Sequence, residues 1–271
     1  MSDELARIAA ALERLAPAAA AKTDWLSAPA YVWQGAARSV AALQAPPLAL
    51  LKGIDPQKDA VTGNVARLAQ GHAAHDMLLW GSRGMGKSAL LRAAVVAAQS
   101  NGPDRIALVQ VAPEALSSLA QLFAALGQQP RQFLVFIDDL GFEDHDSAGP
   151  RALRSWLEGG IEARPGNVRI AVTSNRRAIV PRHLSEQDDP INPRDAVDDR
   201  LALADRFGLS IGFHNCSQDD YLAIVAGYCT EHALDWTEAA ALEWSKRRGA
   251  RSGRVAWQFV TELAGRAGKV L

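Results

Sequence analysis

The chain has 271 residues, which suits one large domain or one domain with a small satellite. Hydrophobic residues make up 48% of it and charged residues 22%, which is ordinary for a globular protein in water. The 29 lysines and arginines nearly balance the 30 aspartates and glutamates, and the net charge of −1 argues against a general affinity for nucleic acid or for an anionic membrane.

The first 49 residues differ in composition from the rest of the chain and are interpreted as a helical extension. Apolar residues recur at helical spacing over residues 2–16, where Ser2 can cap the start of a helix. An irregular stretch with Trp25, Tyr31 and Trp33 comes after this segment. Because aromatic side chains are usually buried, we expect this stretch to pack on the main body rather than on a partner.

No targeting segment or membrane span is predicted. The chain begins with Asp3 and Glu4 instead of a basic region, and no apolar secretory core comes after them. The longest uncharged run near the front, Ser39–Leu51, is too short to cross a bilayer. The two cysteines, Cys216 and Cys229, are too few for a zinc site and are expected to be reduced. We therefore expect a cytoplasmic protein that does not enter a membrane.

From residue 76 onward, apolar strand-like runs alternate with helical patterns. The strand-like runs are Met77–Trp80, Ile106–Val111, Phe133–Ile137, Val168–Thr173 and Leu209–Phe213. The predicted helices are Lys87–Ala98, Glu114–Leu126, Pro150–Ile161 and about 217–232, 237–248 and 254–266. This order predicts an α/β domain over residues 50–215 with a five-stranded parallel sheet covered on both faces, followed by a helical lid over residues 216–271.

The loop after the first of these strands matches the phosphate-binding pattern G-x-x-x-x-G-K-[ST]. Its residues are Gly81, Ser82, Arg83, Gly84, Met85, Gly86, Lys87 and Ser88, with Ala89 continuing into the helix. Glycines let consecutive backbone N–H groups face phosphate oxygens, and the helix N-terminus adds partial positive charge. Lys87 is expected to bind the β- and γ-phosphates of ATP, and Ser88 to bind Mg²⁺ through its hydroxyl.

A second pair of candidate residues ends the strand Phe133–Ile137. Asp138 is expected to hold Mg²⁺, through water, and Asp139 to orient or deprotonate the attacking water. The side chain of Asp139 is one methylene shorter than that of a glutamate, and Glu143 in the following acidic turn is the alternative base. The sequence therefore predicts a site for ATP and Mg²⁺, with Asp139 preferred over Glu143.

These motifs, together with three later segments, resemble the AAA+ family of P-loop ATPases. Thr173-Ser174-Asn175-Arg176 ends a strand where that family carries a polar residue that senses the γ-phosphate, and Asn175 matches it. Asp205-Arg206-Phe207-Gly208 resembles the arginine-finger segment of bacterial branch-migration motors, with Arg206 as the finger. Ser252-Gly253-Arg254 resembles the start of the lid helix that carries a second phosphate sensor, here Arg254.

The resemblance extends from about residue 50 to the end of the chain. The segment Leu51–Asp55, with Gly53 and Ile54, is similar to the one that packs beside adenine in this family. The combination of Glu158–Pro165 with the later Thr-Ser-Asn-Arg-Arg and Asp-Arg-Phe-Gly runs is most similar to an uncharacterised bacterial AAA+ group, domain of unknown function 815. Two departures are an Asp-Asp pair in place of the usual Asp-Glu and Met85 where the loop often has threonine.

The resemblance implies an ATP hydrolase that forms a ring-like homo-oligomer, such as a hexamer, and remodels or switches a protein or nucleic-acid client. One alternative is a slow or non-hydrolysing switch, in which ATP only stabilises a binding-competent state. A P-loop kinase is a weaker alternative, because the C-terminal region is all helical. Each arginine also has a structural interpretation: Arg206 as an ion-paired surface residue, and Arg254 as part of a solvated basic helix end or a nucleic-acid patch.

Overall fold

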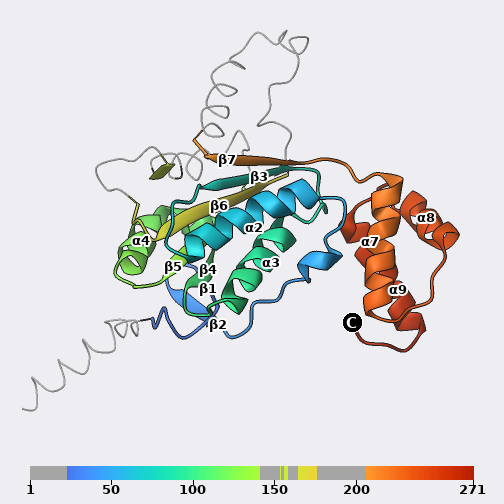
Figure 1. The fold of residues 1–271 in the computed structure, drawn as a ribbon, viewed down its shortest axis with the longest axis horizontal. Helices are drawn as coiled ribbons and strands as arrows, with labels where there is room; N and C mark the ends of the chain where they lie inside the picture. The colour runs from blue at the N-terminus through green and yellow to red at the C-terminus, as the bar shows by residue number, and fades with distance from the viewer. Residues whose placement is uncertain (1–22, 141–152, 154–155, 158–163, 176–205) are drawn as a thin grey trace, which may run out of the picture.

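The computed structural model describes residues 23–140, 153, 156, 157, 164–175 and 206–271, which contain a seven-stranded sheet with the order β2-β1-β4-β5-β6-β3-β7 (Figure 1). Five of its strands lie where the sequence predicts them: β3 (Met77–Gly81), β4 (Ile106–Val111), β5 (Gln132–Ile137), β6 (Val168–Ser174) and β7 (Leu209–Phe213). These five strands are parallel to one another. The predicted α/β class with a parallel sheet is confirmed.

The expected number of five strands is wrong, because part of the N-terminal extension joins the sheet. β1 (Ala30–Trp33) runs parallel to β4, and β2 (Ala37–Val40) runs antiparallel to β1. Each strand has only four residues, too few to give a clear periodic pattern in the sequence. The aromatic residues of this stretch are buried against the sheet, as expected, and the indole of Trp33 donates a 2.8 Å hydrogen bond to Ser118 Oγ.

A buried arginine ties this added edge to the rest of the sheet. The Arg131 side chain donates to the carbonyl oxygens of Trp25 and Ala28, at 3.1 and 2.7 Å. Its other terminal nitrogen donates to the carbonyl oxygens of Pro103 and Ile106, at 2.7 and 2.9 Å. These four bonds satisfy both terminal nitrogens of the buried guanidinium group and fix residues 25–28 against the start of β4, whereas Arg131 Nε has no hydrogen-bond partner within the described structure.

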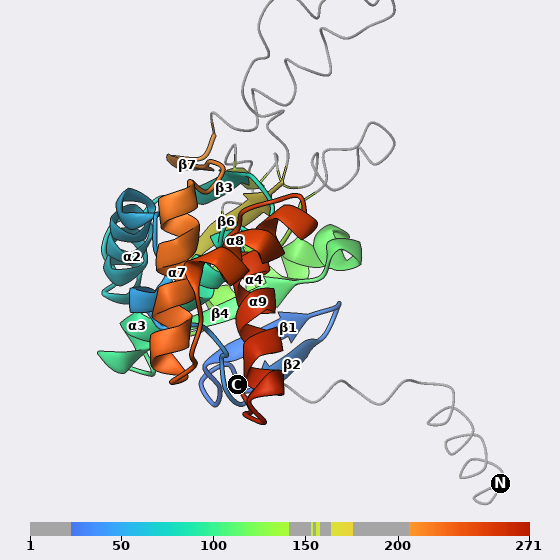
Figure 2. The same cartoon turned by 90° about the vertical axis from the view of Figure 1, so that its right-hand side faces the viewer.

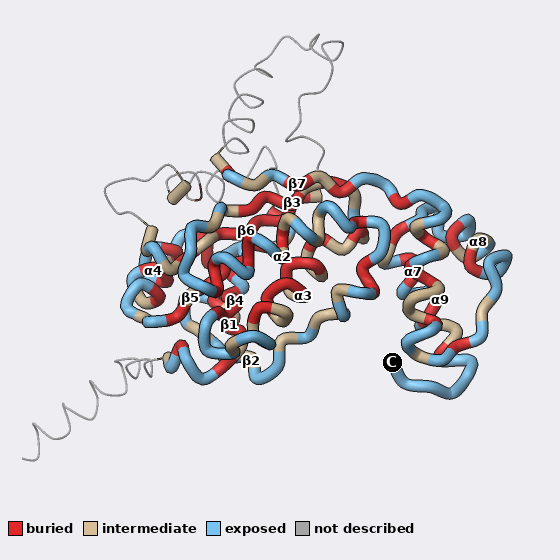
Figure 3. Tube along the Cα trace, in the orientation of Figure 1, coloured by how far each residue is buried: buried red, intermediate tan, exposed pale blue. Residues whose placement is uncertain are grey.

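Helices cover both faces of the sheet. On one face lie α2 (Asp55–Ala69) and α3 (Lys87–Ser100), whose buried residues share a core with Met77 and Leu79 of β3. On the other lie the 3₁₀ helix η2 (Pro113–Ser118) and α4 (Leu119–Gly127), in a second core with Leu78. Alternate residues of the central strands β3, β4, β5 and β6 therefore face different cores, and these four strands are buried on both sides (Figure 3).

The helix α2 is an element that the sequence analysis did not identify. It begins with Asp55 and a proline in its first turn, and it buries Val61, Val65 and Leu68 at spacings of four and three residues. It comes after a second short 3₁₀ helix, η1 (Leu48–Leu50). This stretch leads the chain from the sheet edge to β3, the strand before the phosphate-binding loop.

Three helices come after β7, as predicted: α7 (Gln218–Glu231), α8 (Glu238–Arg247) and α9 (Gly253–Arg266). Each begins at a hydroxyl residue whose side chain accepts a backbone N–H bond, and these caps are Ser217, Thr237 and Ser252. Figure 2 shows α7 and α9 side by side at one end of the sheet. The phenol of Tyr221 in α7 donates to the carbonyl oxygen of Ala241 in α8 at 3.1 Å, which joins the third helix to the group.

Both cysteines are free thiols and are buried, in agreement with the expected reduced state. Burial raises the pKa of Cys216 to about 11 and also raises that of Cys229, so both are protonated at neutral pH. In the part of the chain that the structure describes, no helix is long and apolar enough to cross a membrane.

Several predictions fall outside the described residues. They are the helix over residues 2–16, most of the helix Pro150–Ile161 and the alternative base Glu143. The division of the chain at residues 49 and 215 also stays a prediction.

Candidate nucleotide-binding site

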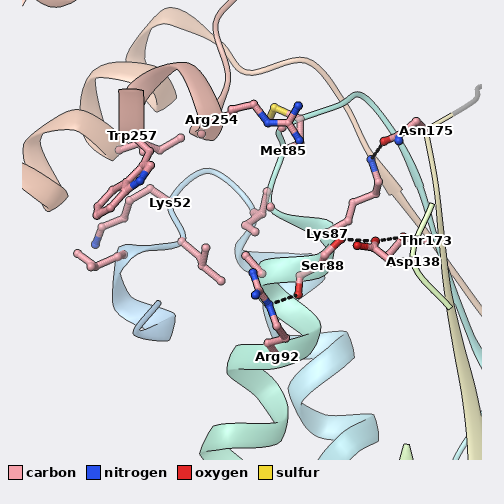
Figure 4. A pocket seen from close by; sticks show the side chains of 18 of the residues that line it. Lys52, Met85, Lys87, Ser88, Arg92, Asp138, Thr173, Asn175, Arg254 and Trp257 are labelled. Atoms are coloured by element: carbon pink, nitrogen blue, oxygen red, sulfur yellow. Dashed lines mark hydrogen bonds between the residues drawn. The ribbon is translucent and has the colours of Figure 1, made fainter. Parts of the chain in front are cut away.

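A cavity of about 400 Å³ lies where the phosphate-binding loop, the ends of two strands and the lid helices meet (Figure 4). It brings together eleven of the residues that the sequence analysis selected. They are Ile54, Gly84, Met85, Gly86, Lys87, Ser88, Ala89, Asp138, Asp139, Asn175 and Arg254. Residues from distant parts of the chain therefore converge on one cavity, which includes both predicted acidic residues and the predicted lid arginine.

The loop between β3 and α3 has the conformation that its glycines make possible. Gly81 has φ 116°, and a Cβ atom there would lie 2.1 Å from the carbonyl oxygen of Phe213 in the neighbouring strand. Gly86, at the N-cap of α3, has φ 88° in the left-handed region. Side chains at these two positions would be strained or would clash, so the loop depends on glycine in both places. The N-terminus of α3 then provides backbone N–H groups and partial positive charge.

The ammonium group of Lys87 lies at the centre of the polar end of the cavity. Only 6% of the residue's surface is exposed. The Nζ atom donates to the carbonyl oxygens of Gly81 and Ser82, at 2.8 and 2.9 Å, and to Asn175 Oδ1 at 3.0 Å. Burial lowers the pKa of Lys87, while the carboxylates of Asp139 and Asp138 act in the opposite direction. The ammonium group of Lys87 is thus fixed in place by three oxygen acceptors.

Asp138 comes directly after β5 and accepts two hydroxyl hydrogen bonds on one carboxylate oxygen. Ser88 Oγ donates to Asp138 Oδ1 at 2.7 Å, and Thr173 Oγ1 donates to the same atom at 2.6 Å. A hydroxyl and a carboxylate at this spacing are oxygen donors of the type that Mg²⁺ prefers. In nucleotide sites Mg²⁺ takes few protein ligands and obtains the rest from phosphates and water, so this pair fits the predicted ion.

Asp139, the next residue, has φ 50°, which is uncommon for a residue other than glycine. Its backbone N–H donates to Thr173 Oγ1 at 2.8 Å, and its carboxylate accepts a hydrogen bond from the side-chain amide of Asn175. The oxygen of the same amide accepts a hydrogen bond from Lys87 (Figure 4). Asn175 therefore links the lysine of the loop to the second aspartate. The structure thus places Asn175 between the two motifs.

Comparisons with known proteins agree with this geometry. The sequence model of a family described as "Protein of unknown function (DUF815)" matches residues 26–267. The chain belongs to the DUF815 family. No curated protein sequence matches it.

Solved structures show which fold the DUF815 protein has. The Thermotoga maritima RuvB Holliday junction branch migration motor matches it with a TM-score of 0.55 at 16% identity, over 84% of this chain and 68% of that one. The Aeropyrum pernix ORC1 protein, solved in complex with DNA, matches with a TM-score of 0.55 at 15% identity, over 81% of this chain and 63% of that one. The shared feature is the AAA+ fold, which the DUF815 protein therefore has.

In the DUF815 protein the first turn of α9 contacts the loop between β3 and α3 directly. The backbone N–H of Arg254, in the first turn of α9, donates to the carbonyl oxygen of Gly84 at 3.2 Å. The side chain of Arg254 is exposed and lies near Met85 in Figure 4. The N-terminus of α9 therefore faces the same cavity as the N-terminus of α3, so two positive helix ends meet there.

Five selected residues do not line the cavity. Gly81 and Ser82 contribute carbonyl oxygens to Lys87, and the hydroxyl of Ser82 is hydrogen-bonded to Asn215 at 2.6 Å. Arg83 is exposed, and Gly53 packs so closely on the first turn of α7 that a Cβ atom there would lie 2.8 Å from Asp220. Arg206 is partly exposed in the turn before β7, which is an edge strand of the described sheet.

The apolar end of the cavity contains residues that the sequence analysis missed. Ile224 and Tyr228 of α7 and Trp257 of α9 line it opposite Leu50, Leu51 and Lys52. The rings of Tyr228 and Trp257 are 4.9 Å apart at 63°, and Trp257 is 38% exposed. One signal was present in the sequence: Trp257 lies three residues after Arg254, so the two share one helix face.

Proposed function

We propose that this DUF815 protein binds ATP with Mg²⁺ and hydrolyses it, and that it uses this cycle to switch or remodel a macromolecular client. The observation that best supports this proposal is the hydrogen-bond network that joins Lys87, Asn175 and Asp139. It lies beside the hydrogen-bonded pair of Ser88 and Asp138. A P-loop lysine, a cation-binding pair, a carboxylate base and a phosphate sensor are the parts that ATP hydrolysis needs.

Binding rests on the phosphate-binding loop and the two helix N-termini. A triphosphate in the cavity meets backbone N–H groups of residues 84–89 and the ammonium group of Lys87, which exchanges its carbonyl contacts for phosphate oxygens. Arg254 adds a guanidinium group from the lid side. The adenine base of ATP then lies at the apolar end of the cavity, between Leu51 or Ile54 and the aromatic residues of the lid.

Hydrolysis requires an ordered water and stabilised charge. Mg²⁺, when bound, supplies positive charge for the phosphate oxygens, and Ser88 and Asp138 would hold it. Asp139 accepts the proton of the attacking water or orients that water, and Asn175 holds the Asp139 carboxylate through its amide. The oxygen of the same amide accepts a hydrogen bond from Lys87, which supports the proposal that Asn175 responds to the γ-phosphate.

The cycle is proposed to act on the lid and on a neighbouring copy of the chain. Residues 216–271 would move as a lid through Arg254, with the main body at residues 50–215. Arg206, at an edge strand and outside the cavity of its own chain, would complete the site of a neighbour in a ring-like homo-oligomer such as a hexamer. The client would be a protein or a nucleic acid in the cytoplasm.

A second candidate is a slow or non-hydrolysing switch. It is favoured by the hydrogen bond between Asn175 and Asp139, which occupies one oxygen of the carboxylate that would otherwise contact the attacking water. In that case ATP would stabilise one lid position without frequent turnover.

Binding of a fluorescent ATP analogue to Lys87→Ala tests the proposed site. The matched control is Lys52→Ala, because Lys52 lines the same cavity at its apolar end and is exposed. We expect Lys87→Ala to fold, as judged by circular dichroism, and to lose most nucleotide affinity, since charge-assisted hydrogen bonds contribute about 1.5–3 kcal/mol each. Lys52→Ala should retain binding. Equal affinity of Lys87→Ala and the unmodified protein would refute the site, and release of phosphate from ATP separates the ATPase from the slow switch.

A further inference from the structure

One threonine hydroxyl lies between the two aspartates of the site and contacts both. Thr173 Oγ1 donates its proton to Asp138 Oδ1 at 2.6 Å and accepts the backbone N–H of Asp139 at 2.8 Å. The carbonyl oxygen of Thr173 also accepts the backbone N–H of Leu140 at 2.9 Å. Three hydrogen bonds from one residue of β6 therefore hold the turn at the end of β5.

The surroundings of Thr173 make this hydroxyl a rigid group. The residue is 2% exposed, and it lies within β6, which pairs with β5 on one side and with β3 on the other. Its β-branched side chain has few rotamers available in a strand. Its oxygen has one proton, which points to Asp138, so its acceptor side is available to the N–H of Asp139.

For Asp138, the bond from Thr173 fixes the carboxylate before a cation arrives. Ser88 donates to the same oxygen from the opposite side of the site, so both partners define its orientation. Mg²⁺ demands near-ideal octahedral geometry and tolerates misplaced ligands poorly. A carboxylate held in advance therefore binds the ion at lower concentration than a carboxylate that rotates freely.

For Asp139, the same hydroxyl supports an unfavourable backbone. A φ of 50° is strained for aspartate, and such strain persists where surrounding contacts enforce it. The N–H bond to Thr173 and the side-chain bond from Asn175 are two such contacts. Without the hydroxyl, Asp139 can relax to ordinary backbone angles, which would move its carboxylate away from the water that it serves.

We propose that Thr173 is a positioning residue that sets the geometry of both aspartates and so couples Mg²⁺ binding to water activation. This inference rests on the proposed ATPase function. Thr173 touches neither nucleotide nor water in this scheme and acts through Asp138 and Asp139. Loss of the Thr173 hydroxyl should therefore change the Mg²⁺ dependence and the turnover, but not the ATP affinity in the absence of Mg²⁺.

The test compares Thr173→Val with Thr173→Ser. Valine keeps the branched shape and removes the hydroxyl, whereas serine keeps the hydroxyl. The matched control is Ser174→Ala, because Ser174 lies next in β6, is 1% exposed, and its hydroxyl has no hydrogen-bond partner within the described structure. ATP affinity is measured in EDTA and across Mg²⁺ concentrations, together with the hydrolysis rate.

For Thr173→Val we expect the Mg²⁺ concentration that gives half of the maximal ATP affinity or hydrolysis rate to rise about tenfold. Turnover should fall by about the same factor or more. ATP affinity in EDTA should stay within about twofold of the unmodified value, since that affinity depends on Lys87 and the loop. Thr173→Ser should have a Mg²⁺ dependence and a turnover close to those of the unmodified protein, and Ser174→Ala should change neither quantity.

Normal Mg²⁺ dependence and turnover in Thr173→Val would overturn the inference, as would an equal loss of ATP affinity in EDTA, which indicates a structural role alone. If the unmodified protein binds ATP without turnover, the Mg²⁺ dependence of ATP binding alone tests the inference. A normal dependence in Thr173→Val would then overturn it. Failure of the unmodified protein to bind ATP at all would overturn the proposed function and this inference together.

Discussion

The two ends of the cavity are built in different ways. At the phosphate end, side chains from the start of α3 and from the ends of β5 and β6 form a hydrogen-bonded network around Lys87, in which Lys87 and Thr173 are almost completely buried. At the other end, here called the base end because the nucleotide base is proposed to lie there, most of the wall is apolar and aromatic. It comes from Leu50, Leu51 and Ile54 and from α7 and α9, and Trp257 remains 38% exposed.

This difference indicates which part of the site is preformed and which part adjusts. The phosphate end is attached to the middle of a sheet that is buried on both faces, so its geometry depends on the most rigid part of the molecule. The base end depends on where the lid lies, and one hydrogen bond between the backbones of Arg254 and Gly84 joins α9 to the loop. We expect changes at the phosphate end to alter phosphate binding or turnover, and changes at the base end to alter the part of the affinity that depends on the nucleotide base.

The largest effect is expected at a residue that belongs to neither end. Arg206→Ala should bind ATP normally but lower the hydrolysis rate by about three to five orders of magnitude, because an arginine finger stabilises charge in the transition state. Activity is measured over a range of protein concentrations, with light scattering to monitor assembly with ATP and Mg²⁺.

A mixture of Arg206→Ala with Lys87→Ala sharpens this prediction. One copy then has an intact finger and the other an intact loop, so mixed oligomers should recover part of the activity. A fully active monomer at every concentration would contradict an action of Arg206 across subunits.

The next largest effect is expected at the phosphate end. Asp139→Asn should keep ATP bound and slow hydrolysis by about two to four orders of magnitude, the usual contribution of a positioned base. The amide keeps the size of the carboxylate but cannot take the proton. If Asp139→Asn kept full turnover and Glu143→Gln lost turnover, the catalytic base would be Glu143 instead.

The smallest effect is expected at the base end. Trp257→Ala should weaken ATP binding by about 1–3 kcal/mol, the usual contribution of one aromatic side chain stacked on a base, or roughly 5- to 150-fold in Kd. Inorganic tripolyphosphate, which has no base, should bind both forms equally in a competition assay. Trp257→Phe, which keeps an aromatic face, is the control. Equal weakening of tripolyphosphate would show that the two ends are not independent.

Much of the phosphate end was predictable because its signals are local. Gly81 and Gly86 lie at the two ends of a tight turn that other residues cannot form, and Lys87 and Ser88 begin the helix directly after it. The strand before the loop and the strand that ends in Asp138 are apolar runs of the length that parallel sheets require. The capped starts of α7 and α9 are likewise encoded in a few neighbouring residues.

The sequence by itself thus determined the parallel α/β class, the glycine-dependent loop between β3 and α3, and the three helices α7, α8 and α9. The tertiary structure decided that β1 extends the sheet beside β4, that Tyr228 and Trp257 line one cavity with Leu51, and that one hydroxyl joins the two aspartates. The physical reason is distance along the chain: Lys87 and Asn175 are 88 positions apart, and Thr173 lies 35 positions from Asp138. Local patterns specify helices, turns and strands, whereas the packing of the sheet specifies which of their side chains meet.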